Sequence, residues 1–113
     1  MNMIKVSATS RTAAVAGAIA GVVREHHRAE VQAIGAGAVN QAVKALILAT
    51  GYLRLDGIQV NCVPEFADVT IEDKVRTAIK LVIEARHMPH SSEAADVRTE
   101  YKVRTAIKQG VEP

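Results

Sequence analysis

Aromatic side chains and cysteine are scarce in this chain of 113 residues. It has no tryptophan, and its only Phe and Tyr residues are Tyr52, Phe66 and Tyr101. So few rings cannot line a groove, which argues against nucleic-acid binding by base stacking on an aromatic platform. The single cysteine, Cys62, excludes an internal disulfide and a multi-cysteine zinc site, and it is typical of a protein from a reducing cytoplasm.

A membrane-spanning run and a strong net charge are also missing. The segment most similar to a targeting signal, residues 13–23 (AAVAGAIAGVV), is too short to span a bilayer. Charged residues follow it, where a signal peptide needs small residues for cleavage. We therefore expect a buried helix there, in a cytoplasmic protein with no membrane partner. The net charge of +2 allows a modest basic face but excludes a histone-like polycation.

Patterns that support catalysis or metal binding are absent as well. The sequence has no catalytic triad, no paired carboxylates in a shared loop and no phosphate loop with a lysine. We therefore expect no enzyme activity, no cofactor and no small-molecule substrate. The histidines at 26, 27, 87 and 90 lack the cysteine or carboxylate spacing of a zinc site. His26 and His27 are more typical of a helix end, and Cys62 is expected to fill the core.

What the sequence does contain is an alternation of strand and helix patterns. Residues 3–7 and 30–34 are predicted as strands, and residues 13–27 and 38–50 as helices. Ser10 or Thr12 is expected to cap the first helix, and Gly51 to end the second. Ala13, Gly17 and Gly21 recur every four residues in the first helix. Two glycines there cost about 1 kcal/mol each, so we expect another backbone to pack closely against them.

The second half of the pattern is strand only. Residues 58–63 and 67–71 are predicted as strands separated by Pro64, and residues 75–84 as the longest strand, after a hairpin turn at 72–74. The resulting β-α-β-α-β-β order predicts an α/β fold of two layers, with two helices on one face of a small mixed sheet.

The C-terminal part contains a repeat. Residues 87–96 are polar and are predicted as a linker, and residues 97–113 as an extension that repeats the last strand. Residues 95–108 match residues 67–80 at eleven of fourteen positions, and KVRTAIK is identical in both. Such a strand could add to the sheet edge of a neighbouring molecule and build filaments. The alternative is a vestigial duplication in a loose tail.

Three strings of the sequence carry a resemblance to a known family. KVSATSRTAAVAGAIAGVVRE, QAIGAGAVNQAVKA and RTAIKLVIE occur in the order and spacing of the stage V sporulation protein S family, which the chain resembles over residues 3–86. The resemblance implies a two-layer Alba-like fold for a domain at 3–86, a homodimer or higher oligomer, and nucleic-acid binding in bacterial development. The Alba proteins carry a lysine pair after the first strand, whereas this chain has Arg11 there and Lys5 on the strand.

The candidate nucleic-acid interface lies at the starts of the two predicted helices. Small residues precede both helices, so their free amides could hold phosphate oxygens. The candidate residues are Lys5, Ser7, Ser10, Arg11, Asn40, Gln41 and Lys44. The alternative interpretation is structural: Ser10 caps a helix, glycines form turns, and Asn40 and Gln41 stabilise a dimer. Arg76 and Lys80 could contact nucleic acid from the last hairpin, as the resemblance implies, but a solvated strand face explains them better.

These observations predict a non-enzymatic regulator of bacterial development that binds nucleic acid, either DNA or RNA. Binding is expected to be dominated by phosphate contacts and to have low sequence specificity. The alternative function is a self-assembling scaffold, whose interfaces are the glycine-faced helix and the repeated strand.

Overall fold

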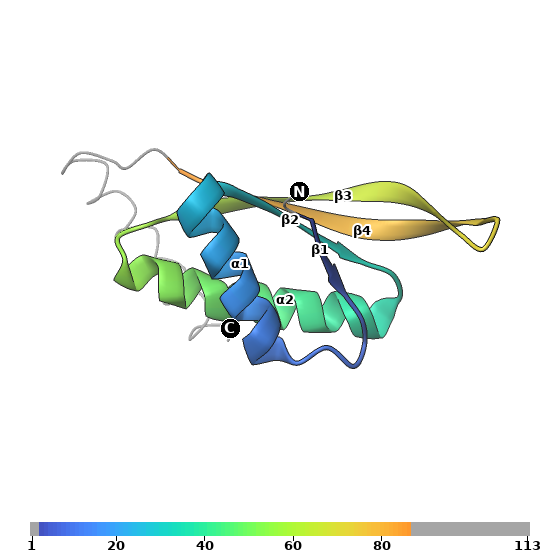
Figure 1. Cartoon of the computed structure of the whole chain (residues 1–113), viewed down its shortest axis with the longest axis horizontal. Coiled ribbons are helices and arrows are strands. Elements are labelled where there is room, and N and C mark those ends of the chain that lie inside the picture. Colours follow the sequence, from blue (N-terminus) through green and yellow to red (C-terminus); the bar gives the residue numbers. More distant parts are fainter. Residues whose placement is uncertain (1–2, 87–113) are drawn as a thin grey trace, which may run out of the picture.

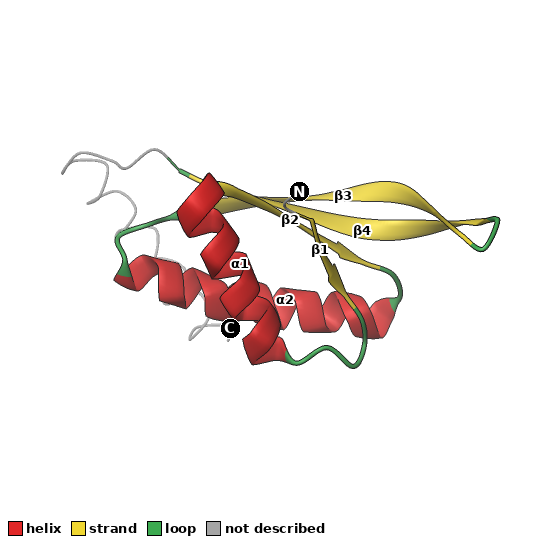
Figure 2. Ribbon diagram, viewed as in Figure 1, coloured by secondary structure: helices red, strands yellow, loops and turns green. Residues whose placement is uncertain are grey.

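The computed structural model describes residues 3–86 and forms one helix-on-sheet unit (Figures 1 and 2). Two helices alternate with the first two strands, and a hairpin follows, so the expected β-α-β-α-β-β order is confirmed. The elements are β1 (Met3–Val6), α1 (Thr12–His26), β2 (Arg28–Ala33), α2 (Ala36–Leu55), β3 (Val60–Ile71) and β4 (Lys74–Ala85). The predicted linker at 87–96 and extension at 97–113, including the repeat at 95–108, lie outside the described residues.

The four strands form one mixed sheet in the order β1-β2-β4-β3. β1 and β2 are parallel, and β4 is antiparallel to both β2 and β3. Both helices lie on the same face of the sheet, and no described element covers the other face (Figure 2). This arrangement confirms the predicted two-layer α/β fold.

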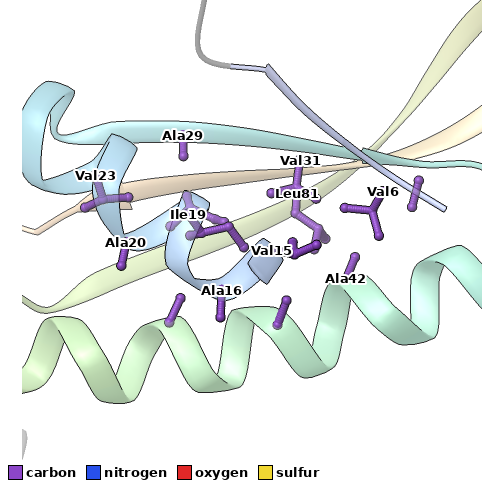
Figure 3. Packing of buried hydrophobic residues seen from close by; sticks show 14 of the residues in the cluster. Val6, Val15, Ala16, Ile19, Ala20, Val23, Ala29, Val31, Ala42 and Leu81 are labelled. Atoms are coloured by element: carbon purple, nitrogen blue, oxygen red, sulfur yellow. The ribbon is translucent and has the colours of Figure 1, made fainter. Parts of the chain in front are cut away.

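The core lies between the sheet and the two helices. Side chains alternate along β2, so that Ala29, Val31 and Ala33 are buried on the helix side. From the sheet, Val31 and Leu81 point toward Ile19 of α1 (Figure 3). The residues that both helices bury are mostly alanines, which allows α1 and α2 to pack closely: Ala16, Ala20, Ala38, Ala42, Ala45 and Ala49.

The prediction that Gly51 ends the second helix is wrong. α2 continues to Leu55, because Leu53, beyond the glycine, is fully buried in the core. The turn that follows ends the helix: Ile58 N donates to Leu53 O (2.9 Å), and Gly57 has a φ of 75°. Burial of a leucine is worth about 2 kcal/mol and exceeds the cost of about 1 kcal/mol for a glycine inside a helix.

The predicted break at Pro64 is also wrong. β3 runs through the proline without interruption, and Pro64 pairs with Leu81 of β4. β3 is an edge strand with a hydrogen-bonding neighbour on one side only, so a missing N–H is tolerated where it faces outward. The hairpin therefore stays regular up to a two-residue turn, Glu72 and Asp73, both with positive φ.

Close packing against the glycines of α1 does not occur within the described residues. A Cβ built on Gly17 or Gly21 meets no atom within 4 Å, and both glycines are exposed. The expectation of a close backbone neighbour is therefore wrong for residues 3–86. Within the same range, neither helix is both long and apolar enough to cross a membrane.

Candidate nucleic-acid interface

Both helices begin at the same edge of the sheet. β1 and β2 are parallel, so they end at one edge, and each is followed by a short loop and a helix (Figure 1). Neither helix has a side-chain cap or an acidic residue in its first turn. The first amides of a helix carry a partial positive charge, so two uncapped helix starts lie at this edge.

The loop before α1 is held by its own hydroxyl groups. Ser7 N donates to Ser10 Oγ (2.9 Å), Ser10 N donates to Ser7 O (3.1 Å), and Thr9 N donates to Ser7 Oγ (3.3 Å). The prediction that Ser10 or Thr12 caps α1 is therefore wrong, because Ser10 bonds back into the loop and Arg11 occupies the N-cap position without a side-chain bond. The amides at the start of α1 have no side-chain cap as a result.

The loop before α1 contacts the first turn of α2 through a glycine. A Cβ placed on Gly37 would lie 2.9 Å from Ala8 Cβ, closer than two such atoms normally approach. The space beside Gly37 is thus occupied by Ala8 of the loop before α1. Gly35, with a φ of 94°, provides the backbone conformation that starts α2.

Gln41, in the second turn of α2, joins this helix to the start of α1. Its Nε2 donates to Ser10 O (2.8 Å) and lies 3.2 Å from Thr12 Oγ1. The amide nitrogen is therefore engaged within the protein, which gives Gln41 a positioning role. Asn40 is exposed beside it, and Lys44 is exposed one helical turn further along α2. At 1.5 Å per residue, Lys44 lies about 12 Å along the axis from the start of α2.

The basic candidates differ in how they are placed. Lys5 is exposed on the sheet face away from the helices, one residue before the end of β1, and Arg11 is exposed at the N-cap of α1. The backbones of Lys5 and Arg11 therefore lie close to the edge where β1 and β2 end, whereas Lys44 lies further along α2. None of these three side chains forms an ion pair with another residue of the range 3–86.

Two other arginines, Arg24 of α1 and Arg28 of β2, are neutralised by carboxylates. Arg24 pairs with Asp56 (2.7 Å), and Arg28 pairs with Glu30 and Glu84 (2.6 Å each). Hydrogen bonds to Glu30 and then to Glu84 raise the pKa of Arg28, and the bond from Arg28 lowers the pKa of Glu30. These two guanidinium groups therefore already have carboxylate partners within the chain.

The two candidate residues of β4, Arg76 and Lys80, also differ. Lys80 lies between Glu65 (3.6 Å) and Glu30 (3.9 Å), so its charge is balanced on the open sheet face. Arg76 is exposed on the same face and forms no ion pair with residues 3–86. Of this pair, Arg76 alone offers a charge that is not already balanced by a carboxylate of the described chain.

The histidine and cysteine positions support no metal site among residues 3–86, where no three His, Cys, Asp or Glu side chains come together. His26 ends α1, and His27 N donates to Val23 O (2.8 Å) in a left-handed turn. His87 and His90 lie outside the described residues. Burial raises the pKa of the half-buried Cys62 thiol, which lowers its reactivity as a nucleophile.

Sequence reasoning missed two partners in this interface. Thr12 lies against the amide of Gln41, and Ala8 occupies the space beside Gly37. Both contacts join residues about thirty positions apart, so no local pattern indicates them.

The three sequence segments that carry the family resemblance all lie within the described residues 3–86. The family model described as stage V sporulation protein S matches residues 2–86, which spans all six helices and strands. The chain therefore belongs to the stage V sporulation protein S family, a family of sporulation-related proteins.

Proposed function

We propose that the protein is a non-enzymatic regulator that binds the phosphate backbone of DNA or RNA at the edge where both helices start. The proposal rests on one observation: both helices start uncapped, with no acidic residue in either first turn, and the loop before α1 contacts the first turn of α2 through Ala8 and Gly37. Such amides stabilise phosphate oxygens, and small residues around them allow a close approach.

Basic side chains add to this anion-binding edge. Arg11 lies at the N-cap of α1 and Lys5 near the end of β1 on the other sheet face, and neither is neutralised within residues 3–86. Ser7 and Ser10 lie in the loop between them, while Gln41 holds the loop against α2. Lys44 and Asn40 extend the same surface along α2. Lys and Arg contacts to phosphate carry no sequence information, so we expect little sequence preference.

Few cations per chain make binding weak and dependent on salt. Each phosphate contact contributes about 0.9 to the slope of log affinity against log salt for a DNA duplex. With three basic residues, the slope of log affinity against log salt for one chain should be no steeper than about −3. Useful affinity requires more than one copy on the same nucleic acid.

The test is a neutralising double variant, Lys5→Gln with Arg11→Gln. We expect the affinity for a short duplex at low salt to fall at least about ten-fold and the salt slope to decrease by about 2. The matched control is Lys74→Gln with Arg86→Gln, which removes the same charge from exposed residues remote from the helix starts. Fluorescence anisotropy measures both. An equal loss in the control variant would contradict the proposed site.

A second candidate function is a self-assembling scaffold, favoured by the position of the repeated sequence. Residues 67–80, which recur at 95–108, comprise the outer part of the β3–β4 hairpin with its turn. The sequence duplicated is thus a whole hairpin tip, with two strand segments that pair with each other in the described copy. Removal of residues 87–113 discriminates between the two functions.

A further inference from the structure

The outer edge of β3 is the longer of the two outer edges of the described sheet. β3 pairs only with β4, so one side of its 12 residues has no hydrogen-bonding neighbour within residues 3–86. The strand at the opposite edge, β1, has only four residues. A row of free N–H and C=O groups is a template for another strand, and proteins normally pair, shorten or cover such an edge.

Two features limit the open part of this edge. Pro64 has no N–H to donate, so a ladder along β3 is weakened at that position. The turn at Glu72 and Asp73 ends the strand on the other side. The edge that can accept a new strand therefore runs over residues 65–71. It belongs to the part of the hairpin that extends past the ends of both helices (Figure 1).

The chain contains a second copy of the strand that already pairs with this segment. In the hairpin, residues 74–80 (KVRTAIK) pair antiparallel with residues 65–71. Residues 102–108 repeat that sequence without a change. The identity stops at Gln109, which corresponds to the β4 residue that pairs with Pro64. The repeated strand thus has the sequence and the length that fit the open part of the edge.

On the open sheet face, the register of the hairpin brings a lysine of the repeat to a carboxylate. Glu65 contacts Lys80 of β4 (3.6 Å), and its side chain is 49% exposed. Residues directly opposite each other in neighbouring strands share a sheet face. A repeat strand in the same register therefore places Lys108, the copy of Lys80, opposite Glu65 on its other side.

On the helix side, the same register covers an exposed aromatic ring. Pro64, Glu65, Phe66 and Ile79 line an open hollow of about 280 Å³, and Phe66 is 79% exposed. Phe66 lies opposite Ile79 of β4, and no strand of the range 3–86 pairs with it on its other side. The register places Ile107, the copy of Ile79, on that free side. Phe66 is then flanked by an isoleucine on each side.

The connection is long enough for the repeat to reach the edge of its own chain. β4 ends beside the start of β3, where Arg86 N donates to Gln59 O (2.7 Å). From there to the hairpin turn, the 12 residues of β3 cover about 40 Å. Residues 87–101 can span up to about 50 Å. A tethered segment that reaches its site has an effective concentration of about millimolar, above that of a second copy in dilute solution.

We propose that residues 102–108 add to the outer edge of β3 in the same chain, antiparallel to residues 65–71 and in the register of the β3–β4 hairpin. The edge is then closed within each molecule. This differs from the scaffold candidate, in which the repeat pairs with a neighbouring molecule. It also does not depend on nucleic-acid binding.

Engineered cysteine pairs test this register in the full chain. The background is Cys62→Ser, which removes the native thiol. Two pairs lie opposite each other in the proposed register: Asp68→Cys with Thr105→Cys, and Val69→Cys with Arg104→Cys. Two adjacent pairs are used because narrow and wide pairs alternate along an antiparallel ladder. Circular dichroism verifies that each variant keeps its fold.

The matched control pair is Asp68→Cys with Lys102→Cys. The register separates these positions by three residues, or about 10 Å, which is too far for a disulfide. After oxidation, a non-reducing gel and mass spectrometry distinguish a disulfide within one chain from one between chains. We expect at least one register pair to form its disulfide within one chain, at a yield independent of protein concentration. The control pair should form far less.

Amide hydrogen exchange, followed by NMR, gives a second measurement without engineered cysteines. Outward-facing amides of residues 65–71 have no acceptor within residues 3–86, so the added strand should slow their exchange. Thr105→Pro removes an N–H in the middle of the repeat and should speed their exchange about ten-fold or more. The matched control, Ser91→Pro, makes the same kind of change in the linker and should leave their exchange unchanged.

Four results would overturn the proposal. These are no disulfide in either register pair, an equal yield in the control pair, disulfides between chains only, or the same exchange in Thr105→Pro as in the unaltered chain. Disulfides between chains would assign the repeat to the edge of a neighbouring molecule. Because no nucleic acid is present, failure here leaves the phosphate-binding proposal unaffected. Failure of the Lys5 and Arg11 variant to lose affinity likewise leaves this strand addition standing.

Discussion

At the scale of single residues, Gln41 holds α2 to the start of α1. Its amide nitrogen donates to Ser10 O and lies against Thr12 Oγ1, so the side chain connects α2 to the first loop. We expect Gln41→Ala to lower the free energy of unfolding by about 1 kcal/mol, because the partly buried carbonyl of Ser10 loses its donor. Chemical denaturation monitored by circular dichroism measures this loss.

The neighbouring residue provides the control for Gln41. Asn40→Ala changes an exposed side chain on the same turn of α2 and should alter stability by less than about 0.5 kcal/mol. If Gln41 only positions the loop before α1, Gln41→Ala should bind nucleic acid more weakly. The slope of log affinity against log salt should stay unchanged, because no phosphate contact is lost. A reduced slope would mean that the interface loses a phosphate contact when Gln41 is removed.

At the scale of elements, the local patterns predict the type of each element well and some of its limits poorly. The alternation in residues 3–7 and the alanine-rich stretch after residue 12 suffice to place β1 and α1. Gly51 and Pro64 led to wrong predictions of a helix end and a strand break. Both are strong local signals, and the contacts of the folded chain outweigh them. Leu53 gains enough burial to carry α2 past the glycine, and the edge position of β3 tolerates the proline.

Two glycines of α2 illustrate this dependence on context and give a testable pair. A Cβ on Gly51 would meet no atom within 4 Å, whereas a Cβ on Gly37 would collide with Ala8 at 2.9 Å. We expect Gly51→Ala to stabilise the protein by up to about 1 kcal/mol through helix propensity. Gly37→Ala should destabilise the protein, because the added methyl group would collide with Ala8 unless the loop before α1 moves. Thermal unfolding of both variants checks the opposite signs, and stabilisation by Gly37→Ala would contradict the loop contact.

At the scale of the whole molecule, the order of the elements predicts where the candidate residues lie but not which contacts they make. The parallel β1 and β2 bring the two helix starts to one edge, as the β-α-β-α order predicts. Periodicity cannot reveal that Gln41 bonds to Ser10, or that carboxylates neutralise Lys80 while Arg11 has none nearby. Those distinctions arise from contacts between distant segments of the chain.

The last prediction concerns the part of the chain beyond the family match. All candidate phosphate contacts lie within residues 3–86. If nucleic-acid binding is the function, a chain that ends after Arg86 should keep its affinity for a short duplex. If the repeat at 95–108 drives assembly, the full chain should form larger species that the shortened chain does not.

Light scattering on a size-exclusion column, with and without a labelled duplex at low salt, separates these outcomes. The matched control keeps all 113 residues but scrambles the order of residues 87–113, so that length and charge stay constant. A hairpin tip that adds to a sheet edge depends on the alternation of its side chains, and scrambling removes that alternation. Large assemblies that survive scrambling would therefore exclude strand addition by the repeat. Large assemblies that vanish on scrambling and ignore the duplex would instead assign the protein to the scaffold function.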